Sequence, residues 1–439
     1  MPTRRHFLAT TAALTFLPNI RSAFGADDSP GETITVGVMG LSRGASLAAG
    51  FEKQPNCHVK YVCDVDSNRA NTIAASIEKI KERKPQIVGD FRKMLDDPKL
   101  DVLVCAAPNH WHAPATILGC KAGKHVYVEK PCSQTPQEGE WQVEAARKYK
   151  RVVQMGNQRR SWPKIIEGIE LVRSGELGRV YYSRAWYAAT RGTIGRCTEG
   201  PPPAHLDYEL WQGPAPRRPY RTNIIPYNWH WFWHWGGGEL ANNGIHALDL
   251  ARWGMGVDYP TRVTAAGGRY GFDDDQETPD TLVCTYDFPD RKSILWEGLS
   301  CNRHGIDGNP GKIPGSWDRG FGASFHGEKG TLVLDSSGYT LFSGADNEKK
   351  KVPGPGDDGL HFANFLDCIR SVGPDGPTKL PNSDIEGGHK STLLCHLGNI
   401  AYRTGRALKC DAKNGHIVGD EDAMKLWTRE YEKGWEPKV

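Results

Sequence analysis

Excess charge of either sign is missing from this chain of 439 residues, whose formal net charge at pH 7 is +3. Three positive charges, those of Arg4, Arg5 and Arg21, lie in an N-terminal segment that we expect to be removed, so the rest of the chain is close to neutral. A protein without a basic excess has no electrostatic means of binding nucleic acid or an anionic membrane surface. We therefore predict neither as a partner.

Paired cysteine motifs are missing as well. The 11 cysteines include no Cys-x-x-Cys pair and no spacing typical of metal ligands. Cys63 and Cys105 fall inside apolar runs, where a free cysteine behaves as a small buried hydrophobic residue. We predict reduced, buried thiols and no metal centre.

The apolar stretch near the N-terminus is too short to cross a bilayer, because it ends at about Leu17. It follows the pair Arg4-Arg5, and small residues come after it at 23–26. This arrangement is typical of a twin-arginine export signal, the alternative being a disordered basic start. We expect residues 1–26 to be removed and the mature protein to be periplasmic or otherwise exported, without stable membrane insertion.

Short apolar runs alternate with helical stretches from Thr33 onward. Such alternation is typical of a parallel sheet with helices on both faces. The predicted strands are 34–39, 59–63, 102–106, 126–128 and 152–155, and the clearest helices are 68–84 and 136–148. We predict an α/β Rossmann domain over residues 32–155.

The pattern changes after residue 156, where predicted strands follow one another without regular helices between them. These strands are 180–186, 262–266, 282–288, 293–296, 331–334 and 340–342, and helices are predicted at 362–369 and 391–403. We predict an α+β C-terminal domain over 156–439 with a large, mostly antiparallel open sheet. The irregular segments 188–227 and 301–322 are long enough to be functional or to form an interface, and the C-terminal tail is expected to wrap back onto the body.

A tight turn, Gly40-Leu-Ser-Arg-Gly44-Ala45, follows the first strand directly. Glycines there allow backbone N–H groups to approach a pyrophosphate at a helix N-terminus, although the match to G-x-G-x-x-G is imperfect. Asp64 ends the second strand, where a carboxylate binds ribose hydroxyls and favours NAD, while Arg69 keeps NADP open. The cofactor-binding residues assigned to this region are Gly40, Ser42, Arg43, Gly44 and Asp64.

Two further strand ends carry polar residues. After the strand at 102–106 come Asn109, His110 and His112, which either face the cofactor or cap and pack the next helix. After the strand at 126–128 come Glu129 and Lys130, and the following proline ends the strand because it donates no hydrogen bond. A lysine at the carboxyl end of a buried strand meets ligand in an α/β fold, so all five residues are assigned to the cofactor site.

The segment from Asn228 to Gly238 contains four alternating tryptophans at positions 229, 231, 233 and 235. In an extended chain these side chains share one face, which could stack on the apolar faces of a sugar ring. A tryptophan stripe is more often part of a core, and at least half of these are assigned to packing. We predict that the segment lines the substrate side, with Trp231 as a substrate-binding residue.

Three glycines lead into a helical stretch with Asn242, Asn243, His246 and Asp249. Asn242 and His246 are four residues apart and share a face if the helix begins this early. His246 titrates near neutrality and is predicted to take a proton from an alcohol, with Asp249 orienting its ring. The alternative is a buried, hydrogen-bonded histidine. Other histidines nearby lack an acidic ligand pattern and predict no metal.

Together these motifs resemble the Gfo/Idh/MocA family of glucose–fructose oxidoreductases and inositol dehydrogenases. The resemblance covers nearly all of the chain after the predicted signal, and it includes the Glu129-Lys130-Pro131 and Gly236–His246 motifs. The segments 154–160, 207–216 and 429–431 are similar in sequence to those of an exported bacterial branch of this family. The resemblance implies a pyridine nucleotide, a sugar or cyclic polyol substrate, and assembly into a homo-oligomer. Because an exported protein meets little free NAD, we expect the nucleotide to be tightly bound.

The resemblance also implies roles for individual residues. Lys130 would hold the reacting hydroxyl and His246 would accept its proton. Asn242 is assigned to the catalytic site with them, although dehydrogenases of the family usually have aspartate at this position and Asn cannot carry a proton. The remaining residues assigned to the site are Asn157 for the cofactor and Arg159 and Asn243 for the substrate.

Two alternatives to an NAD(P)-dependent oxidoreductase stay open. A sister group with similar export signals hydrolyses glycosides by oxidising the sugar transiently, eliminating the aglycone, adding water and reducing again. Members specific for α-N-acetylgalactosamine tend to lack the lysine equivalent to Lys130, whereas an exported protein benefits from a self-recycling cofactor. The third alternative is an inert cofactor-binding relative, which intact Lys130 and His246 disfavour.

Overall fold

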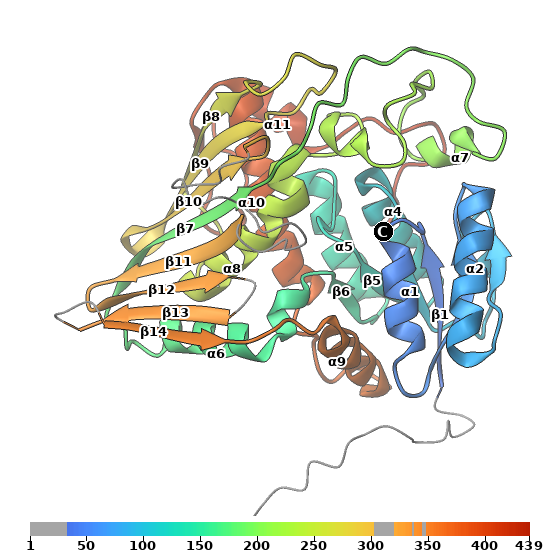
Figure 1. The fold of residues 1–439 in the computed structure, drawn as a ribbon, viewed down its shortest axis with the longest axis horizontal. Helices are drawn as coiled ribbons and strands as arrows, with labels where there is room; N and C mark the ends of the chain where they lie inside the picture. The colour runs from blue at the N-terminus through green and yellow to red at the C-terminus, as the bar shows by residue number, and fades with distance from the viewer. Residues whose placement is uncertain (1–32, 303–319, 336–337, 345–347) are drawn as a thin grey trace, which may run out of the picture.

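The computed structural model describes residues 33–302, 320–335, 338–344 and 348–439. The predicted export signal and most of the 301–322 segment lie outside the described residues. Two large sheets, each with its own helices, form most of the described structure, and they lie side by side in Figure 1; a small two-stranded sheet pairs β15 (Val372–Gly373) with β16 (Gly376–Pro377).

The first sheet is parallel and has the strand order β3-β2-β1-β4-β5-β6. Its strands are β1 (Ile34–Met39), β2 (Cys57–Cys63), β3 (Gln86–Val88), β4 (Val102–Cys105), β5 (His125–Val128) and β6 (Val153–Met155). The helices between them are α1 (Gly44–Glu52), α2 (Ser67–Lys81), α3 (Arg92–Leu95), α4 (Asn109–Lys121) and α5 (Pro136–Lys148). This is the predicted Rossmann arrangement, with β1 and β4 meeting where the strand order reverses. The short strand β3 was not predicted.

The second sheet has the order β14-β13-β12-β11-β7-β10-β9-β8-β17. Its strands are β7 (Val180–Ala188), β8 (Arg262–Gly268), β9 (Thr281–Phe288), β10 (Lys292–Leu299), β11 (Phe321–Gly327), β12 (Gly330–Asp335), β13 (Gly338–Ser343), β14 (Glu348–Pro353) and β17 (Leu408–Lys409). Among these described strands, only β7 and β10 pair in parallel. The predicted mostly antiparallel sheet is therefore confirmed.

Three strands of this sheet were missed. β11 begins inside the segment that we expected to be irregular, and β14 has the polar sequence Glu-Lys-Lys-Lys-Val-Pro with nearly every side chain exposed. A solvated edge strand carries no apolar alternation, because neither face is buried. β17 is two residues long and too short to show a period.

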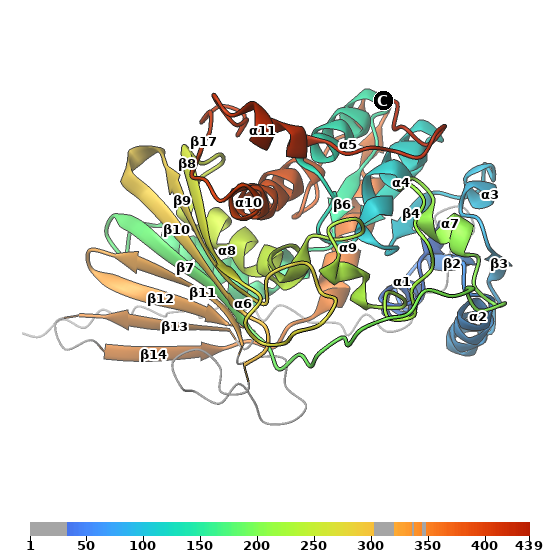
Figure 2. The ribbon, with the colours of Figure 1, turned by 90° about the horizontal axis from the view of Figure 1, so that it is seen from above.

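Helices cover only one face of the second sheet among the described residues, as Figure 2 shows. They are α6 (Pro163–Arg173), α8 (Ile245–Met255) and α10 (Ile385–Thr404), and α10 also packs against α5 of the first domain. The remaining short elements are η1 (Gln158–Ser161), α7 (Tyr208–Gln212), η2 (Asn228–Trp231), η3 (Leu240–Gly244), η4 (Pro289–Arg291), β15 (Val372–Gly373), β16 (Gly376–Pro377), α11 (Glu421–Met424) and η6 (Lys425–Trp427). No helix of the described residues is long and apolar enough to span a membrane.

Chain segments after residue 156 complete the first domain. Helix α9 (Asp358–Arg370) packs Phe362 and Phe365 against Phe51 and Tyr127 beneath the first sheet. The C-terminal tail does wrap back, since Arg429 and Tyr431 bind the buried carboxylate of Glu138 at the start of α5. The two domains therefore share their cores rather than meeting as separate bodies.

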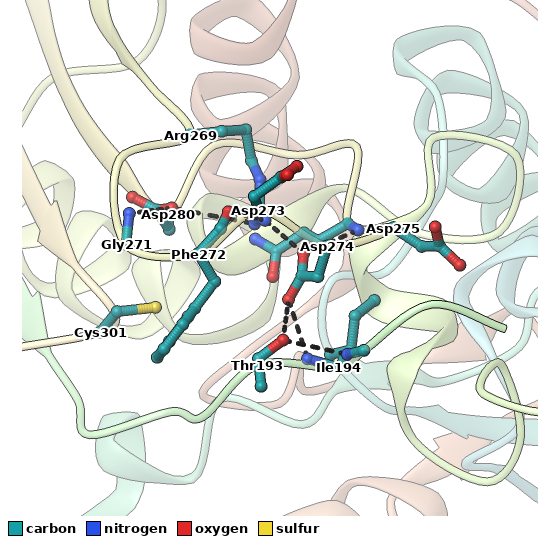
Figure 3. Close-up of polar contacts among 12 residues, drawn as sticks. Thr193, Ile194, Arg269, Gly271, Phe272, Asp273, Asp274, Asp275, Asp280 and Cys301 are labelled. Atoms are coloured by element: carbon teal, nitrogen blue, oxygen red, sulfur yellow. Dashed lines mark hydrogen bonds and ion pairs between the residues drawn. The ribbon is translucent and has the colours of Figure 1, made fainter.

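The long segment 188–227 is anchored to the second sheet by buried carboxylates. Asp274 accepts hydrogen bonds from the Thr193 hydroxyl at 2.8 Å and the Ile194 N–H at 2.9 Å, and it pairs with Arg269 (Figure 3). Nearby, Asp275 accepts from the Cys197 N–H at 2.7 Å. Asp274 and Asp275 lie in the loop between β8 and β9, and this loop therefore holds the irregular segment 188–227 in place.

We predict that Phe365→Ala destabilises the whole protein by about 3–5 kcal/mol, because it leaves a cavity under the first sheet. Phe365 is 0% exposed and lies 5.9 Å from the Tyr127 ring. Chemical denaturation measures the effect, with Leu360→Ala on the same helix as control because Leu360 is 41% exposed. A loss below about 1 kcal/mol for Phe365→Ala would show that the first domain does not depend on α9.

Candidate active site

A cavity of about 600 Å³ opens between the carboxyl ends of the first sheet and the start of α8. It brings together most residues assigned from the sequence, from both domains. Its lining includes Gly40, Ser42, Arg43, Asp64, Asn109, His112, Glu129, Lys130, Arg159, Asn242, Asn243 and His246.

The turn after β1 can come this close to β4 only because residue 40 is glycine. Gly40 has φ +83°, and a Cβ atom there would lie 2.6 Å from the backbone nitrogen of Ala107. Helix α1 then begins at Gly44, so its free N–H groups face the cavity end that suits a pyrophosphate. The imperfect glycine pattern therefore still builds a phosphate cradle.

Asp64 lies at the end of β2 and organises this turn. Its carboxylate accepts hydrogen bonds from the Leu41 N–H at 2.7 Å and the Asp66 N–H at 2.9 Å. Burial raises the pKa of Asp64 above its ordinary value, although these N–H groups oppose that shift. The Arg69 guanidinium lies 3.6 Å from the carboxylate, so a cation also stands beside the predicted ribose position.

Glu129 and Arg43 form a polar floor to the cavity. The Glu129 carboxylate, 4% exposed, accepts from Arg43 Nε at 3.3 Å and from Gln158 Nε2 at 3.3 Å. Arg43 also lies 3.4 Å from Asp358 on α9. Burial opposes the charge of Arg43, but Glu129 outweighs it and raises the pKa of Arg43 above its ordinary value. Arg43 therefore stays cationic beside the phosphate cradle.

Lys130 crosses from the first domain to the second. Its ammonium donates to the backbone oxygen of Asn242 at 2.8 Å and to the Asn242 side-chain oxygen at 3.1 Å. Burial lowers the pKa of Lys130 to about 8, because the charged form is poorly solvated. The lysine thus titrates close to neutral pH, within reach of a substrate.

A buried carboxylate that sequence reasoning missed lies behind Asn242. Asn242 Nδ2 donates to the Tyr227 hydroxyl at 3.1 Å and to Glu239 at 3.4 Å, and Asn243 Nδ2 donates to Glu239 at 2.5 Å. Glu239 is also paired with Arg191. The sequence signal was present, since Glu239 stands one helical turn before Asn242, but it lies outside the aspartate position that the family uses.

His246 lies half-buried in the first turn of α8. Burial, together with the cations Arg159 and Lys130, lowers the pKa of His246 well below its ordinary value, so its ring is neutral and keeps a free lone pair. The expectation that Asp249 orients this ring is wrong. Asp249 instead accepts from Arg160 at 2.7 Å and from Ser391 at 2.6 Å, deep between α8 and α10.

The tryptophan segment is not extended, so its four indoles do not share a face. Residues 228–231 form the 3-10 helix η2 and turns follow it; Gly236 is needed because a Cβ there would lie 2.8 Å from His230 Cα. Trp229 lines the cavity, Trp231 and Trp235 are buried, and Trp233 lines a separate cavity. Trp231 instead packs under Arg191, 4.7 Å from the guanidinium.

His230 is a second neutral imidazole in the cavity and was not assigned from the sequence. Its ring stacks on Trp229 at 3.6 Å, and its Nδ1 lies 2.6 Å from the Tyr227 backbone oxygen. Burial lowers the pKa of His230 well below its ordinary value, and Lys130 adds to that effect. Since Nδ1 must donate to the carbonyl, Nε2 carries the lone pair.

Three residues assigned to the cofactor do not line the cavity, and one of them, Gly44, is buried at the start of α1. His110 is fully buried and bonds the backbone oxygen of Trp211 at 2.9 Å, and Asn157 is 1% exposed behind the site. His112 does line the cavity, with its ring nitrogens facing the carbonyls of Pro131 and Ala107. Among the described residues, no three His, Cys, Asp or Glu side chains gather as metal ligands.

Residues 34–157 match the family model described as "Oxidoreductase family, NAD-binding Rossmann fold", and residues 168–333 match the "GFO/IDH/MocA C-terminal domain". The chain belongs to the Gfo/Idh/MocA family. Its first domain is therefore an NAD-binding Rossmann domain. The Gly40 cradle and the buried Asp64 carboxylate fit such a cofactor.

Individual relatives of the family are distant. The uncharacterized oxidoreductase YrbE of Bacillus subtilis is 26% identical over 235 residues, which are 53% of this chain and 57% of that protein. The alpha-N-acetylgalactosaminidase of Shewanella oneidensis is 27% identical over 210 residues, 42% of this chain and 45% of that protein. The matches thus span about half the length of these relatives.

Solved structures share the fold over a larger part of the chain. The WlbA dehydrogenase from Bordetella pertussis, solved with NADH and UDP-GlcNAcA, superposes with a TM-score of 0.64 and 18% identity. The superposition covers 86% of this chain and 99% of that chain. At this identity the likeness concerns the fold alone.

We predict that the rate of NADH formation falls as the pH rises through about 8, because the ammonium of Lys130 is lost there. Asn242→Asp places a negative charge beside that ammonium, so it should raise the pKa of Lys130 and move this limb to higher pH. Lys130→Arg is the matched control, since a guanidinium does not titrate in this range. A limb that persists unchanged in Lys130→Arg would assign it to another group.

Proposed function

We propose that this protein is an NAD-dependent oxidoreductase acting on the hydroxyl of a sugar or cyclic polyol, with NADP left open by Arg69. One observation carries the proposal: Lys130 of the first domain and His246 of the second line one cavity, beside the phosphate cradle at Gly40. A cation and a neutral imidazole that line one cavity suit a hydroxyl that must lose its proton.

The chemistry of the chain's own residues follows from their charge states. A nicotinamide, when bound, supplies hydride acceptance at the carbinol carbon. His246 is neutral and takes the hydroxyl proton, while the Lys130 ammonium donates a hydrogen bond to the oxygen as negative charge develops there. Asn242 holds that ammonium in place through two oxygens. Trp229 offers an apolar surface for the sugar ring.

A second candidate function is redox-neutral glycoside hydrolysis through a transient keto-sugar. The likeness to an alpha-N-acetylgalactosaminidase supports it, and so does the second neutral imidazole, His230, because removal of the acidified C–H next to the ketone needs another base. Intact Lys130 favours oxidation.

Two measurements test the choice. Denaturing the purified protein and identifying the released nucleotide by mass spectrometry tests the cofactor. Free sugars, polyols and 4-nitrophenyl glycosides are then screened for NADH formation and for 4-nitrophenol release. NADH formation, either free or as one equivalent that stays on the protein, supports the oxidoreductase, whereas release of 4-nitrophenol without net NADH supports the hydrolase. The absence of both would leave an inert relative.

We predict that Lys130→Met and His246→Ala each lower turnover by about 10²–10⁴-fold, because each removes a group that acts on the transferred proton or the developing charge. Circular dichroism checks that the variants are folded. His234→Ala is the control, since His234 lines the separate cavity. Full activity of both site variants would remove the catalytic assignment of Lys130 and His246.

Export and assembly belong to the same proposal. We propose that the protein is exported by the twin-arginine route and acts in the periplasm, where cell fractionation would detect it and loss of export in Arg4→Lys/Arg5→Lys would support the route. We further propose a homo-oligomer that pairs the helix-free face of the second sheet, where Val283 is 38% exposed. Sedimentation velocity measures the assembly, and a monomer at micromolar concentration would contradict it.

A further inference from the structure

The segment 207–216 has no role in the proposed reaction. It lies far from the second sheet, although the chain before it is anchored to that sheet. We name residues 205–213 the strap; it contains α7 and belongs to the second domain. In Figures 1 and 2, α7 lies beyond the first sheet's carboxyl edge, next to α2 and α4. The strap therefore crosses from one domain to the other.

One end of the strap is bound to the loop after β2. The Ser67 N–H donates to the His205 oxygen at 3.0 Å, and the Asp207 N–H donates to the Val65 oxygen at 2.9 Å. Asp66 and Leu206 form an antiparallel bridge between these bonds. This end thus adds a short strand-like pairing immediately beyond Asp64.

The other end of the strap is bound to the start of α4. The Trp211 backbone oxygen accepts from both His110 Nε2 at 2.9 Å and Trp111 Nε1 at 3.0 Å. Gly213 has φ +45°, and a Cβ there would lie 1.9 Å from the Trp111 ring. The buried position of His110, unexpected for a cofactor residue, is explained by this contact.

Between its two ends the strap faces the cavity. Leu206, Leu210 and Trp211 line the same cavity as Asp64, and Leu206 and Trp211 are only 9% and 5% exposed. Since an acidic residue at the end of the second Rossmann strand marks the ribose of the adenosine half, these apolar side chains cover that half.

We infer that the strap covers the adenosine subsite and that it keeps the dinucleotide bound through turnover. The inference rests on the proposed function, because it needs that cofactor in this cavity. The nucleotide can leave only if at least one bound end of the strap detaches. The hydride removed from one carbinol carbon, and its proton on His246, must then return within the site to a carbonyl compound, so one hydroxyl is oxidised and one carbonyl is reduced without an external oxidant.

Ser67→Pro tests whether this contact of the strap retains the cofactor, and it should change little else in the structure. Ser67 is the first residue of α2, where proline is well tolerated, and Asp66 before it already has the extended backbone (φ −95°, ψ 104°) that precedes a proline. The substitution removes the N–H that binds His205 and also the Ser67 hydroxyl, which lies 3.3 Å from the same oxygen. Ser67→Ala removes the hydroxyl alone and is the matched control.

The readout is the release of NADH from the full-length protein, followed by nucleotide fluorescence in stopped flow and by retention through dialysis. We expect the unaltered protein and Ser67→Ala to retain NADH, and Ser67→Pro to release it about three- to tenfold faster. Leu206→Ala provides a second test if Ser67→Pro does not fold, with at least a similar acceleration expected.

Two results would overturn the inference. Rapid release from the unaltered protein, equal to that of the variants, would show that the strap does not retain the cofactor. Slow release from all four proteins would show that retention comes from elsewhere in the cavity. Failure of the unaltered protein to bind NADH or NADPH at all would instead overturn the proposed function.

Discussion

The site depends on one contact across the junction of the two domains, that of the Lys130 ammonium with the two oxygens of Asn242. Its geometry requires β5 to end at Val128, two residues before Lys130, and the η3 turn to present both oxygens at the same point. Because neither oxygen carries a full charge, burial is not fully compensated and the pKa of Lys130 falls to about 8. A carboxylate at position 242 would give a more stable ion pair, but it would also raise the pKa of Lys130, so that the lysine would lose its proton only at higher pH. The asparagine therefore changes the electrostatics of the cleft, not only the identity of a proton carrier.

Three buried carboxylates in and behind the cavity are paired with arginines, and this helps to explain why the histidines stay neutral. Glu129 binds Arg43, Glu239 binds Arg191, and Asp249 binds Arg160. Burial and the nearby cations then dominate, and the pKa values of His230 and His246 both fall. Lone pairs are thus available where a substrate would bind.

Prediction from sequence worked where local pattern and final structure agree, and failed where tertiary contact decides. The central parallel strands β1 and β4 are almost entirely apolar, and the turn at Gly40 requires glycine for a steric reason, so both could be predicted from the sequence. The tryptophan alternation has the period of a strand, yet η2 winds it into a helical turn because Gly236 packs against the backbone of His230. Asp249 stands at helical spacing from His246, but Arg160 comes from a distant segment and takes its carboxylate. Spacing along the chain carries no information about such partners.

The strap is a second example of the limit of prediction from sequence. Its backbone hydrogen bonds with residues 65–67 follow no period, and the irregular composition of 188–227 predicts only that the segment is long. What the sequence does contain is the cap of α7, since Asp207 accepts from the Leu210 N–H at 2.9 Å, and the glycine at 213 that turns the chain beside Trp111. These local features fix the shape of the strap, whereas its position over Asp64 depends on anchors such as Asp274, more than 60 residues later in the chain. A segment held by both domains couples the closure of the cofactor cleft to the packing of the second sheet, so the architecture of the C-terminal domain bears directly on how the first domain holds its nucleotide.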